Sequence, residues 1–154
     1  MAHYEKTVRL PHEAENLFEL VSDIRRYPEF IRWIRSMKVS DQHEVDGAWH
    51  GLGEAQVGFR GFTERFATRV VADPKLMTIR ASLVRGPFKY LDNHWTFHPL
   101  GTGETQIVFR IDYEFRNLVL KMLAKNNLDL AVRKIMDAFI AEADRRYARV
   151  AQPG

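Results

Sequence analysis

A long amphipathic helix is predicted at the end of this chain, from Asn126 to Val150, and it follows an unbroken succession of strand-like runs from Ile34 to Phe115. In the helical segment apolar residues recur at helical spacing, with charged residues between them. The apolar positions are Leu128, Val132, Ile135, Phe139 and Ala143. At about 1.5 Å per residue, the helix is about 37 Å long. It can therefore cover one whole face of a curved sheet and enclose a cavity against it.

Turn signals divide the middle of the chain into strands. Asp46-Gly47, Arg60-Gly61, Asp73-Pro74 and Gly101-Thr102-Gly103 fall between alternating runs, as hairpin turns do, and Gly86-Pro87 marks a further loop. Six strands are predicted, near residues 34–44, 48–59, 62–72, 76–84, 90–100 and 104–115. A seventh, Tyr4–Leu10, alternates in the way that suits a sheet edge.

Two short helices are predicted between the first two strands, one over residues 13–24 and a second around Tyr27 to Phe30. Strand, two helices, six strands and a long helix make the helix-grip order, and tight turns pair sequential strands. The predicted fold class is therefore α+β, with a seven-stranded curved antiparallel sheet wrapped around the C-terminal helix. A length of 154 residues indicates one domain, residues 1–154.

Composition excludes several classes of function. Twenty-three Lys and Arg stand against 20 Asp and Glu, and a net charge of +3 does not resemble a dedicated nucleic-acid binder, so no DNA partner is expected. The absence of cysteine excludes disulfides and thiolate chemistry. No run approaches the about 18 apolar residues of a membrane span, and the start shows no signal-peptide core. We expect a soluble cytoplasmic protein, with peripheral contact at the inner membrane left open.

Two polar side chains are predicted on the inner faces of strands. Glu64 alternates in phase with Phe66, and Asn93 shares a face with Trp95. An unpaired buried carboxylate costs several kcal/mol, and an unpaired amide about 1–3 kcal/mol. Either the two residues pair with each other or lie at the sheet rim, or they face the polar head of a ligand.

Small residues interrupt the inner face of the strand over residues 48–59, at Gly51, Gly53 and Ala55. They mark either free space beneath the helix or close packing against it. The opposite wall includes the bulky Phe109 and Tyr113, which favours a cavity.

Enzyme signatures are mostly missing. His94 and His98 lie in a strand and face outward, which does not favour a metal site. The glycine pairs at residues 51–53 and 101–103 lack the remaining residues of nucleotide-binding loops. Glu64 is the one candidate for a buried base, and no catalytic residue or catalytic cofactor is expected.

The segment from Leu118 to Lys125 is unusually apolar for a junction between a strand and a helix. A short helix packed on the core is the favoured prediction. The alternative is an exposed lip that touches membrane lipid, with Lys121 and Lys125 near anionic headgroups.

Several motifs extend over nearly the whole chain. They are Phe18-Glu19-Leu20-Val21, Asp23-Ile24, Tyr27-Pro28, Phe30, Trp33, Glu54-Ala55-Gln56-Val57-Gly58-Phe59, Glu64-Arg65-Phe66, Gly86-Pro87-Phe88-Lys89, Asn93-His94-Trp95 and Tyr113-Glu114-Phe115. In composition and order they resemble the coenzyme Q-binding Coq10 family. Its bacterial members include the RatA-type proteins of the START-like, polyketide cyclase/dehydrase (SRPBCC) superfamily.

The resemblance implies a START-like helix-grip fold that binds ubiquinone (coenzyme Q) or a similar polyprenyl quinone or isoprenoid lipid between sheet and helix. The protein would act as a quinone chaperone that supports respiratory electron transport, not as an enzyme. The implied head contacts are Glu64 or Asn93, with Phe88 and Lys89 at the mouth. The full set of expected ligand-binding residues is Phe18, Trp33, Val57, Phe59, Glu64, Phe66, Leu83, Phe88, Lys89, Asn93, Trp95, Phe109 and Tyr113.

The resemblance implies two other functions. One is that of a RatA-type toxin that binds the ribosome and blocks subunit association, which a positive surface formed by Arg25, Arg26, Arg32 and Arg35 would favour. The other is a polyketide cyclase-like enzyme, which needs an acid or base beside its substrate, and only Glu64 qualifies.

Overall fold

The computed structural model describes residues 2–59 and 61–147, without the side chains of Phe59, Phe62 and residues 123–129. The elements in chain order are β1 (Ala2–Leu10), α1 (Ala14–Ser22), the 3-10 helix η1 (Ile24–Glu29), β2 (Ile34–Val45), β3 (Ala48–Phe59), β4 (Phe62–Asp73), β5 (Thr78–Arg85), β6 (Phe88–Pro99), β7 (Thr105–Phe115) and α2 (Leu118–Arg146). This is the predicted order of strand, two helices, six strands and a long helix.

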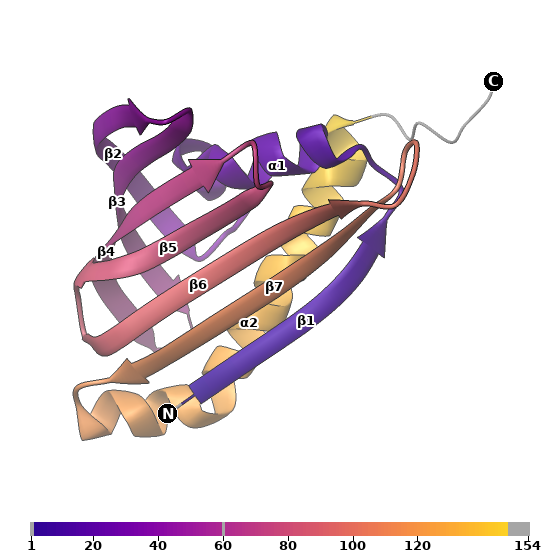
Figure 1. Cartoon of the computed structure of the whole chain (residues 1–154). Coiled ribbons are helices and arrows are strands. Elements are labelled where there is room, and N and C mark those ends of the chain that lie inside the picture. Colours follow the sequence, from indigo (N-terminus) through magenta and orange to yellow (C-terminus); the bar gives the residue numbers. More distant parts are fainter. Residues whose placement is uncertain (1, 60, 148–154) are drawn as a thin grey trace.

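The strands form one antiparallel sheet in the order β1-β7-β6-β5-β4-β3-β2. Sequential strands pair through hairpins, and β1 closes the far edge beside β7, so the predicted sheet and its edge strand are confirmed. Asp46 and Gly47 both have positive φ, 52° and 84°, which is the backbone of a two-residue hairpin turn. The sheet curves, and α2 runs across its concave face (Figure 1).

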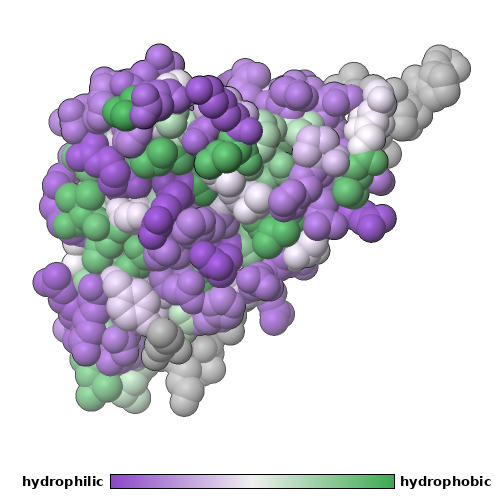
Figure 2. Space-filling view, viewed as in Figure 1, coloured by the Kyte–Doolittle hydropathy of each residue, from purple (hydrophilic) through white to green (hydrophobic). Residues whose placement is uncertain are grey.

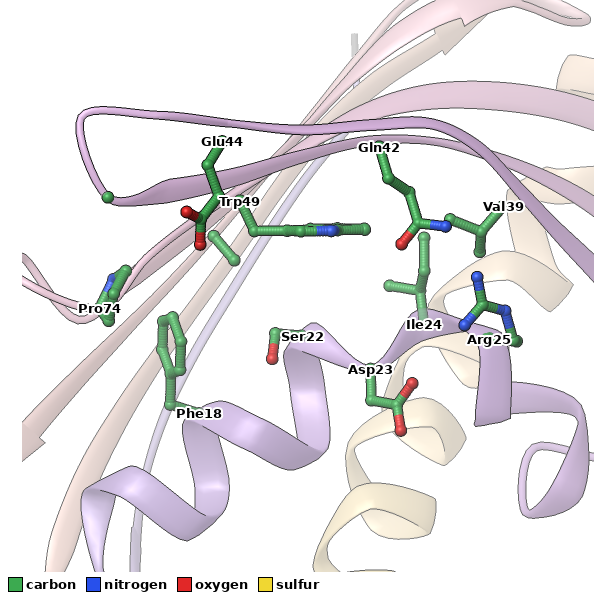
Figure 3. Close-up of a pocket in the computed structure, with 12 residues that line it drawn as sticks. Phe18, Ser22, Asp23, Ile24, Arg25, Val39, Gln42, Glu44, Trp49 and Pro74 are labelled. Carbon is green, nitrogen blue, oxygen red and sulfur yellow. The ribbon is translucent and has the colours of Figure 1, made fainter.

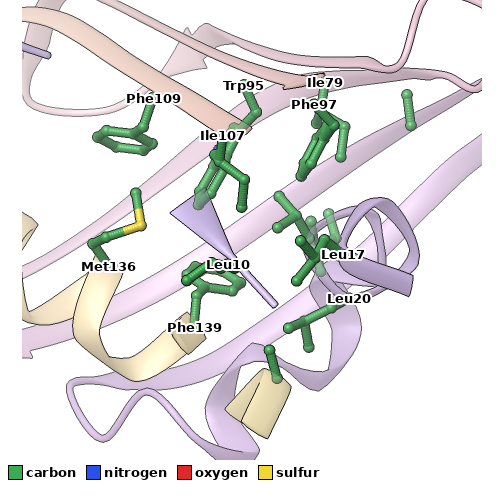
Figure 4. Packing of buried hydrophobic residues seen from close by; sticks show 14 of the residues in the cluster. Leu10, Leu17, Leu20, Ile79, Trp95, Phe97, Ile107, Phe109, Met136 and Phe139 are labelled. Atoms are coloured by element: carbon green, nitrogen blue, oxygen red, sulfur yellow. The ribbon is translucent and has the colours of Figure 1, made fainter. Parts of the chain in front are cut away.

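The core lies between the sheet and the buried stripe of α2, where Val132, Met136, Phe139 and Ala143 are at most 4% exposed. Phe139 is the central contact, because its ring lies 5.0 Å from that of Trp95 on β6 and 5.1 Å from that of Tyr27 on η1. Figure 4 shows Phe139 and Met136 of α2 near Trp95 and Phe109 of the sheet, with Leu17 and Leu20 of α1 beside them.

The last turns of α2 make polar contacts both within the helix and with the loop after β1. Glu142 is only 6% exposed and accepts hydrogen bonds from Arg145 (Nε, 2.9 Å) and Arg146 (Nη2, 2.8 Å). The hydrogen bond from Arg145 is the main cause that lowers the pKa of Glu142 to about 2. The buried His12 lies 2.8 Å from Asp144 through its Nε2, so the loop after β1 is tied to the last turns of the helix.

The start of α2 differs from the prediction. The helix begins at Leu118 instead of Asn126, because the Asn117 side chain caps it by accepting a hydrogen bond from the Val119 backbone N–H at 2.7 Å. The predicted separate short helix packed on the core is therefore wrong. Leu118 and Val119 are 70% and 64% exposed, and Met122 is 70% exposed. The predicted end at Val150 lies outside the described residues.

Candidate ligand-binding cavity

Two adjoining apolar cavities lie between the sheet and α2. The inner cavity has a volume of about 160 Å³ and reaches from η1 and β2 across to Trp95 and Phe109, with Phe139 of α2 on its opposite side. The end cavity, about 110 Å³, lies further toward Phe88 and Tyr113. Phe66, Leu91, Ile111 and Ile135 line both cavities, so the two are neighbours. The predicted space under the helix is therefore present.

The small residues of β3 serve two different purposes. A Cβ placed on Gly51 would lie 2.5 Å from the ring of Trp49, and one on Gly53 would lie 2.8 Å from Ile24, so both glycines allow close packing. Ala55 lines the inner cavity together with Ala81 of β5. Gly53 lines that cavity as well, so close packing alone explains Gly51, whereas Gly53 and Ala55 both border free space.

Most polar groups in the inner cavity are already satisfied by the protein. Asn93 donates a hydrogen bond from Nδ2 to the Arg110 carbonyl at 2.8 Å, and its Oδ1 accepts one from Trp95 Nε1 at 3.0 Å. The Tyr27 hydroxyl donates to the Val21 carbonyl, and burial raises the pKa of this phenol. The wall therefore presents a mainly apolar surface.

Thr68 of β4 is the exception. It lines the inner cavity, and its hydroxyl makes no hydrogen bond with any residue that the structure describes. A hydroxyl can both donate and accept, so Thr68 could bind a ligand oxygen. Thr68 is not among the predicted site residues. Alternation with Phe66 puts it on the inner face of β4, but a lone threonine between apolar neighbours gives no stronger signal.

Glu64 does not occupy its predicted place. It is half-buried near the start of β4, opposite Val57, and lines neither cavity. The predicted pair with Asn93 is wrong, because Asn93 lies level with Ala81 and Val70, far along β4 from Glu64. Glu64 therefore lies at the rim of the sheet, the other position that its pattern allowed.

The remaining predicted site residues divide by position. Residues that line one or both cavities are Trp33, Val57, Phe66, Phe88, Asn93, Trp95, Phe109 and Tyr113. Leu83 packs against the apolar cluster around Phe88 without lining a cavity. The side chain of Phe59 lies outside the described residues.

The predicted mouth is wrong. Phe88 is only 4% exposed and stacks on Phe115 with a centroid distance of 4.6 Å, so it belongs to the wall. Lys89 points to the other side of the strand, where it is 56% exposed and lies 3.9 Å from Glu114. Lys89 is the extra residue where the register of β6 against β7 shifts between Phe88 and Tyr90, so its side chain leaves the face that Phe88 occupies.

Phe18 lines a different depression. This groove, of about 320 Å³, lies between α1, η1 and the β2–β3 hairpin. Figure 3 shows the indole of Trp49 extended across it, with Ser22 and Asp23 on the facing helical segment and Glu44 and Gln42 on the hairpin. Its lining is far more polar than that of the cavities, although Ile24 lines both this groove and the inner cavity.

The described residues hold no group of three or more His, Asp or Glu that could bind a metal ion. His94 lies 3.6 Å from Asp92 on the outer face of β6, and burial lowers the pKa of this imidazole. Within residues 2–59 and 61–147, no helix is both long enough and apolar enough to cross a membrane.

Comparison with known proteins identifies one family for this chain and relatives with two different named functions. The sequence model of the family described as polyketide cyclase / dehydrase and lipid transport matches residues 10–140. The ribosome association toxin RatA of Pseudomonas aeruginosa is 30% identical over 145 residues, which cover 94% of this chain and 97% of the toxin. The mitochondrial coenzyme Q-binding protein coq10 of Schizosaccharomyces pombe is 26% identical over 145 residues, which cover 94% of this chain and 88% of that protein.

Solved structures share the fold, and two of them illustrate the likeness. An 18 kDa protein of Caulobacter crescentus is 38% identical, with a TM-score of 0.77 and coverage of 94% of this chain and 97% of that one. The Zhui aromatase/cyclase of Streptomyces sp. R1128 is 18% identical, with a TM-score of 0.82 and coverage of 98% and 99%, which shows likeness of fold alone. The two curated relatives are named for ribosome association and quinone binding.

Proposed function

The chain belongs to the polyketide cyclase / dehydrase and lipid transport family, and on that premise we propose that it carries a polyprenyl quinone in the cavity between the sheet and α2. The apolar lining of that cavity is the observation that carries the proposal. The relative named for coenzyme Q binding supports a quinone over other lipids. Each buried CH₂ is worth about 0.8 kcal/mol, so one five-carbon isoprene unit gains about 4 kcal/mol when it leaves water.

The volumes of the two cavities limit the size of the ligand that they can hold. An apolar cavity of about 150 Å³ accepts a benzene-sized molecule, whereas drug-sized ligands need about 300 Å³ or more. At about 160 and 110 Å³, the inner and end cavities each match a ring or an isoprene unit. In this proposal the quinone ring and the first isoprene unit occupy the two cavities, and a longer tail requires α2 to move away from the sheet.

Thr68 is our candidate for the head contact. A quinone carbonyl is a hydrogen-bond acceptor, and the Thr68 hydroxyl is a donor without a partner among the described residues. Asn93 already bonds to Arg110 and Trp95, and Glu64 lies outside the cavities. These positions support Thr68 over the two head contacts predicted from the resemblance.

The test is native mass spectrometry with lipid extraction, on protein purified from a quinone-producing host. We expect one polyprenyl quinone per chain. Thr68→Val keeps the shape but removes the donor, so we expect roughly tenfold weaker quinone binding, about 1.4 kcal/mol. The matched control is Thr63→Val, on the exposed outer face of the same strand, which should bind normally. A wild-type protein that stays empty when saturated with quinone would refute the carrier function.

We further propose that the start of α2 contacts an anionic membrane, which would place the protein peripherally at the inner membrane. Leu118, Val119 and Met122 form an exposed apolar patch, with Lys121 38% exposed beside it. Figure 2 shows hydrophobic surface at the lower left, where Figure 1 places the first turns of α2. Partly buried Leu120 packs on the cluster that lines the end cavity, so the patch adjoins the ligand space. Amphipathic helices with flanking cations bind anionic lipid surfaces in this way.

Sedimentation with vesicles that contain phosphatidylserine tests this contact. We expect the double variant Leu118→Ser, Met122→Ser to bind at least tenfold more weakly, because burying each apolar side chain contributes about 1.5–3 kcal/mol. Leu76→Ser is the matched control, since Leu76 is 69% exposed in the β4–β5 turn. Equal losses in both proteins would show that the patch has no special role.

Ribosome association is the second candidate, favoured by the relatives named RatA and by a basic groove on the outer face of the sheet, described below. The predicted arginine surface is only partly available, because Arg26 forms an ion pair with Glu29 at 3.2 Å.

An enzymatic role has weaker support. Glu64 lies outside the two cavities, and no Asp, Glu, His or Lys is among the described residues that line them.

A further inference from the structure

A groove of about 480 Å³ crosses the outer face of the sheet, on the side away from α2, over β2, β3, β4 and the end of β5. Its lining includes Lys38, Arg65 and Arg85 and a single carboxylate, Glu54. Arg85 already pairs with Glu54 at 2.9 Å. Lys38 and Arg65 form no ion pair with any described residue, so the groove carries net positive charge.

A further cation borders the groove because of Gly58. A Cβ at this position would lie 2.5 Å from Nε of Arg35 and 2.8 Å from its Nη2, so the guanidinium lies flat against β3. Gly58 stands two residues beyond Gln56, which lines the groove on the same outer face. Any other residue at Gly58 would displace Arg35.

Two irregularities of the sheet occur at the groove. The register shifts between Ile34 and Ser36 on β2, where Arg35 is the extra residue. It shifts again between Ala67 and Thr68, where Ala67 pairs with Arg85. Bulges re-aim side chains at functional sites. Both bulges here coincide with an arginine at the groove.

We propose that this groove binds the phosphodiester backbone of structured RNA. Cations that lack carboxylate partners attract phosphates, and such contacts fix position without reading sequence. Stacking on single-stranded bases would require exposed aromatic rings, and the one aromatic residue of the lining, Phe66, packs its ring against Phe88. None of the large exposed apolar side chains of the described chain lines the groove, which disfavours a lipid surface.

This inference deepens the second candidate function and rests on it, not on quinone carriage. Lys38, Arg65 and Arg85 of the groove line neither cavity, although Ala55 and Phe66 line both the groove and the inner cavity. RNA binding and quinone binding can therefore fail separately.

Fluorescence anisotropy with a labelled short RNA duplex, over a series of KCl concentrations, tests the groove. We expect Lys38→Ala and Arg65→Ala each to weaken binding roughly threefold or more, and to reduce the slope of log affinity against log salt by about 1. Arg133→Ala removes an exposed cation from α2, on the other side of the molecule, and should change neither quantity. Quinone load, measured in parallel by native mass spectrometry, should be unchanged in all three variants.

Three results would overturn the proposal. One is a wild-type protein that does not bind the duplex at low salt. Another is an equal loss in Arg133→Ala, which would mean that only net charge matters. The third is vesicle binding that Arg65→Ala abolishes while RNA binding is retained, which would assign the groove to lipid phosphates.

Discussion

Phe139→Ala is expected to lower the free energy of unfolding by about 3–5 kcal/mol. Phe139 is 4% exposed, and its ring makes edge contacts with Tyr27, Phe30 and Trp95 at 5.1, 5.3 and 5.0 Å. Truncation would leave a void where α2, η1 and β6 meet. Tyr27, Phe30 and Trp95 would each lose a ring contact. The void would persist, because a rigid aromatic cluster cannot close the space.

Urea unfolding followed by circular dichroism measures this change, with the m-value as a check that both proteins unfold in the same way. Leu118→Ala is the matched control on the same helix, because its side chain is 70% exposed and should change stability by less than about 0.5 kcal/mol. A loss below about 1 kcal/mol in Phe139→Ala would mean that the helix does not depend on this contact.

Ala81→Leu is expected to weaken quinone binding at least tenfold while leaving the fold intact. Ala81 lines the inner cavity and lies level with Val70 and Asn93 on the neighbouring strands. A leucine adds three carbons to a cavity of about 160 Å³, where the quinone ring is proposed to bind. Stability should be unchanged or slightly raised, because filling an apolar cavity is favourable when no strain results.

Quinone titration and thermal unfolding of the same sample separate these two effects. Val71→Leu, which enlarges a side chain on the outer face of β4, is the control and should bind quinone normally. Unchanged affinity in Ala81→Leu, with a normal melting temperature, would place the ligand elsewhere than the inner cavity.

The sheet could be predicted from the sequence because alternation and turn residues act locally. Trp95 and Asn93 face inward, and Asp46-Gly47 makes its hairpin turn, as their patterns indicate. The start of α2 could not be predicted in this way. Periodicity assumes that apolar residues are buried, whereas Leu118 and Met122 are exposed, and a single cap at Asn117 determines where the helix begins.

For the candidate site, the sequence could predict only which face of the sheet each residue occupies. Alternation says which side of a strand a residue occupies, but not whether the helix lies opposite that point. Glu64 and Thr68 share a face of β4, yet only Thr68 reaches the inner cavity. The position of α2 relative to the sheet depends on tertiary packing, above all on Phe139, and that information is spread over the whole chain.

The contacts of α2 are distributed unevenly along its length. Its last turns contact other elements through Asp144, which lies beside His12, and through Arg146, whose guanidinium lies 5.9 Å from the Phe30 ring centroid. In the described part of its start, the contacts are partly buried Leu120 and one ion pair, from Lys121 to Glu114 at 3.5 Å. Among the described residues, the start of α2 therefore has fewer contacts with other elements than its end. The start also carries the apolar patch, so in the membrane proposal a bound lipid surface would act on the part of the helix that adjoins the end cavity.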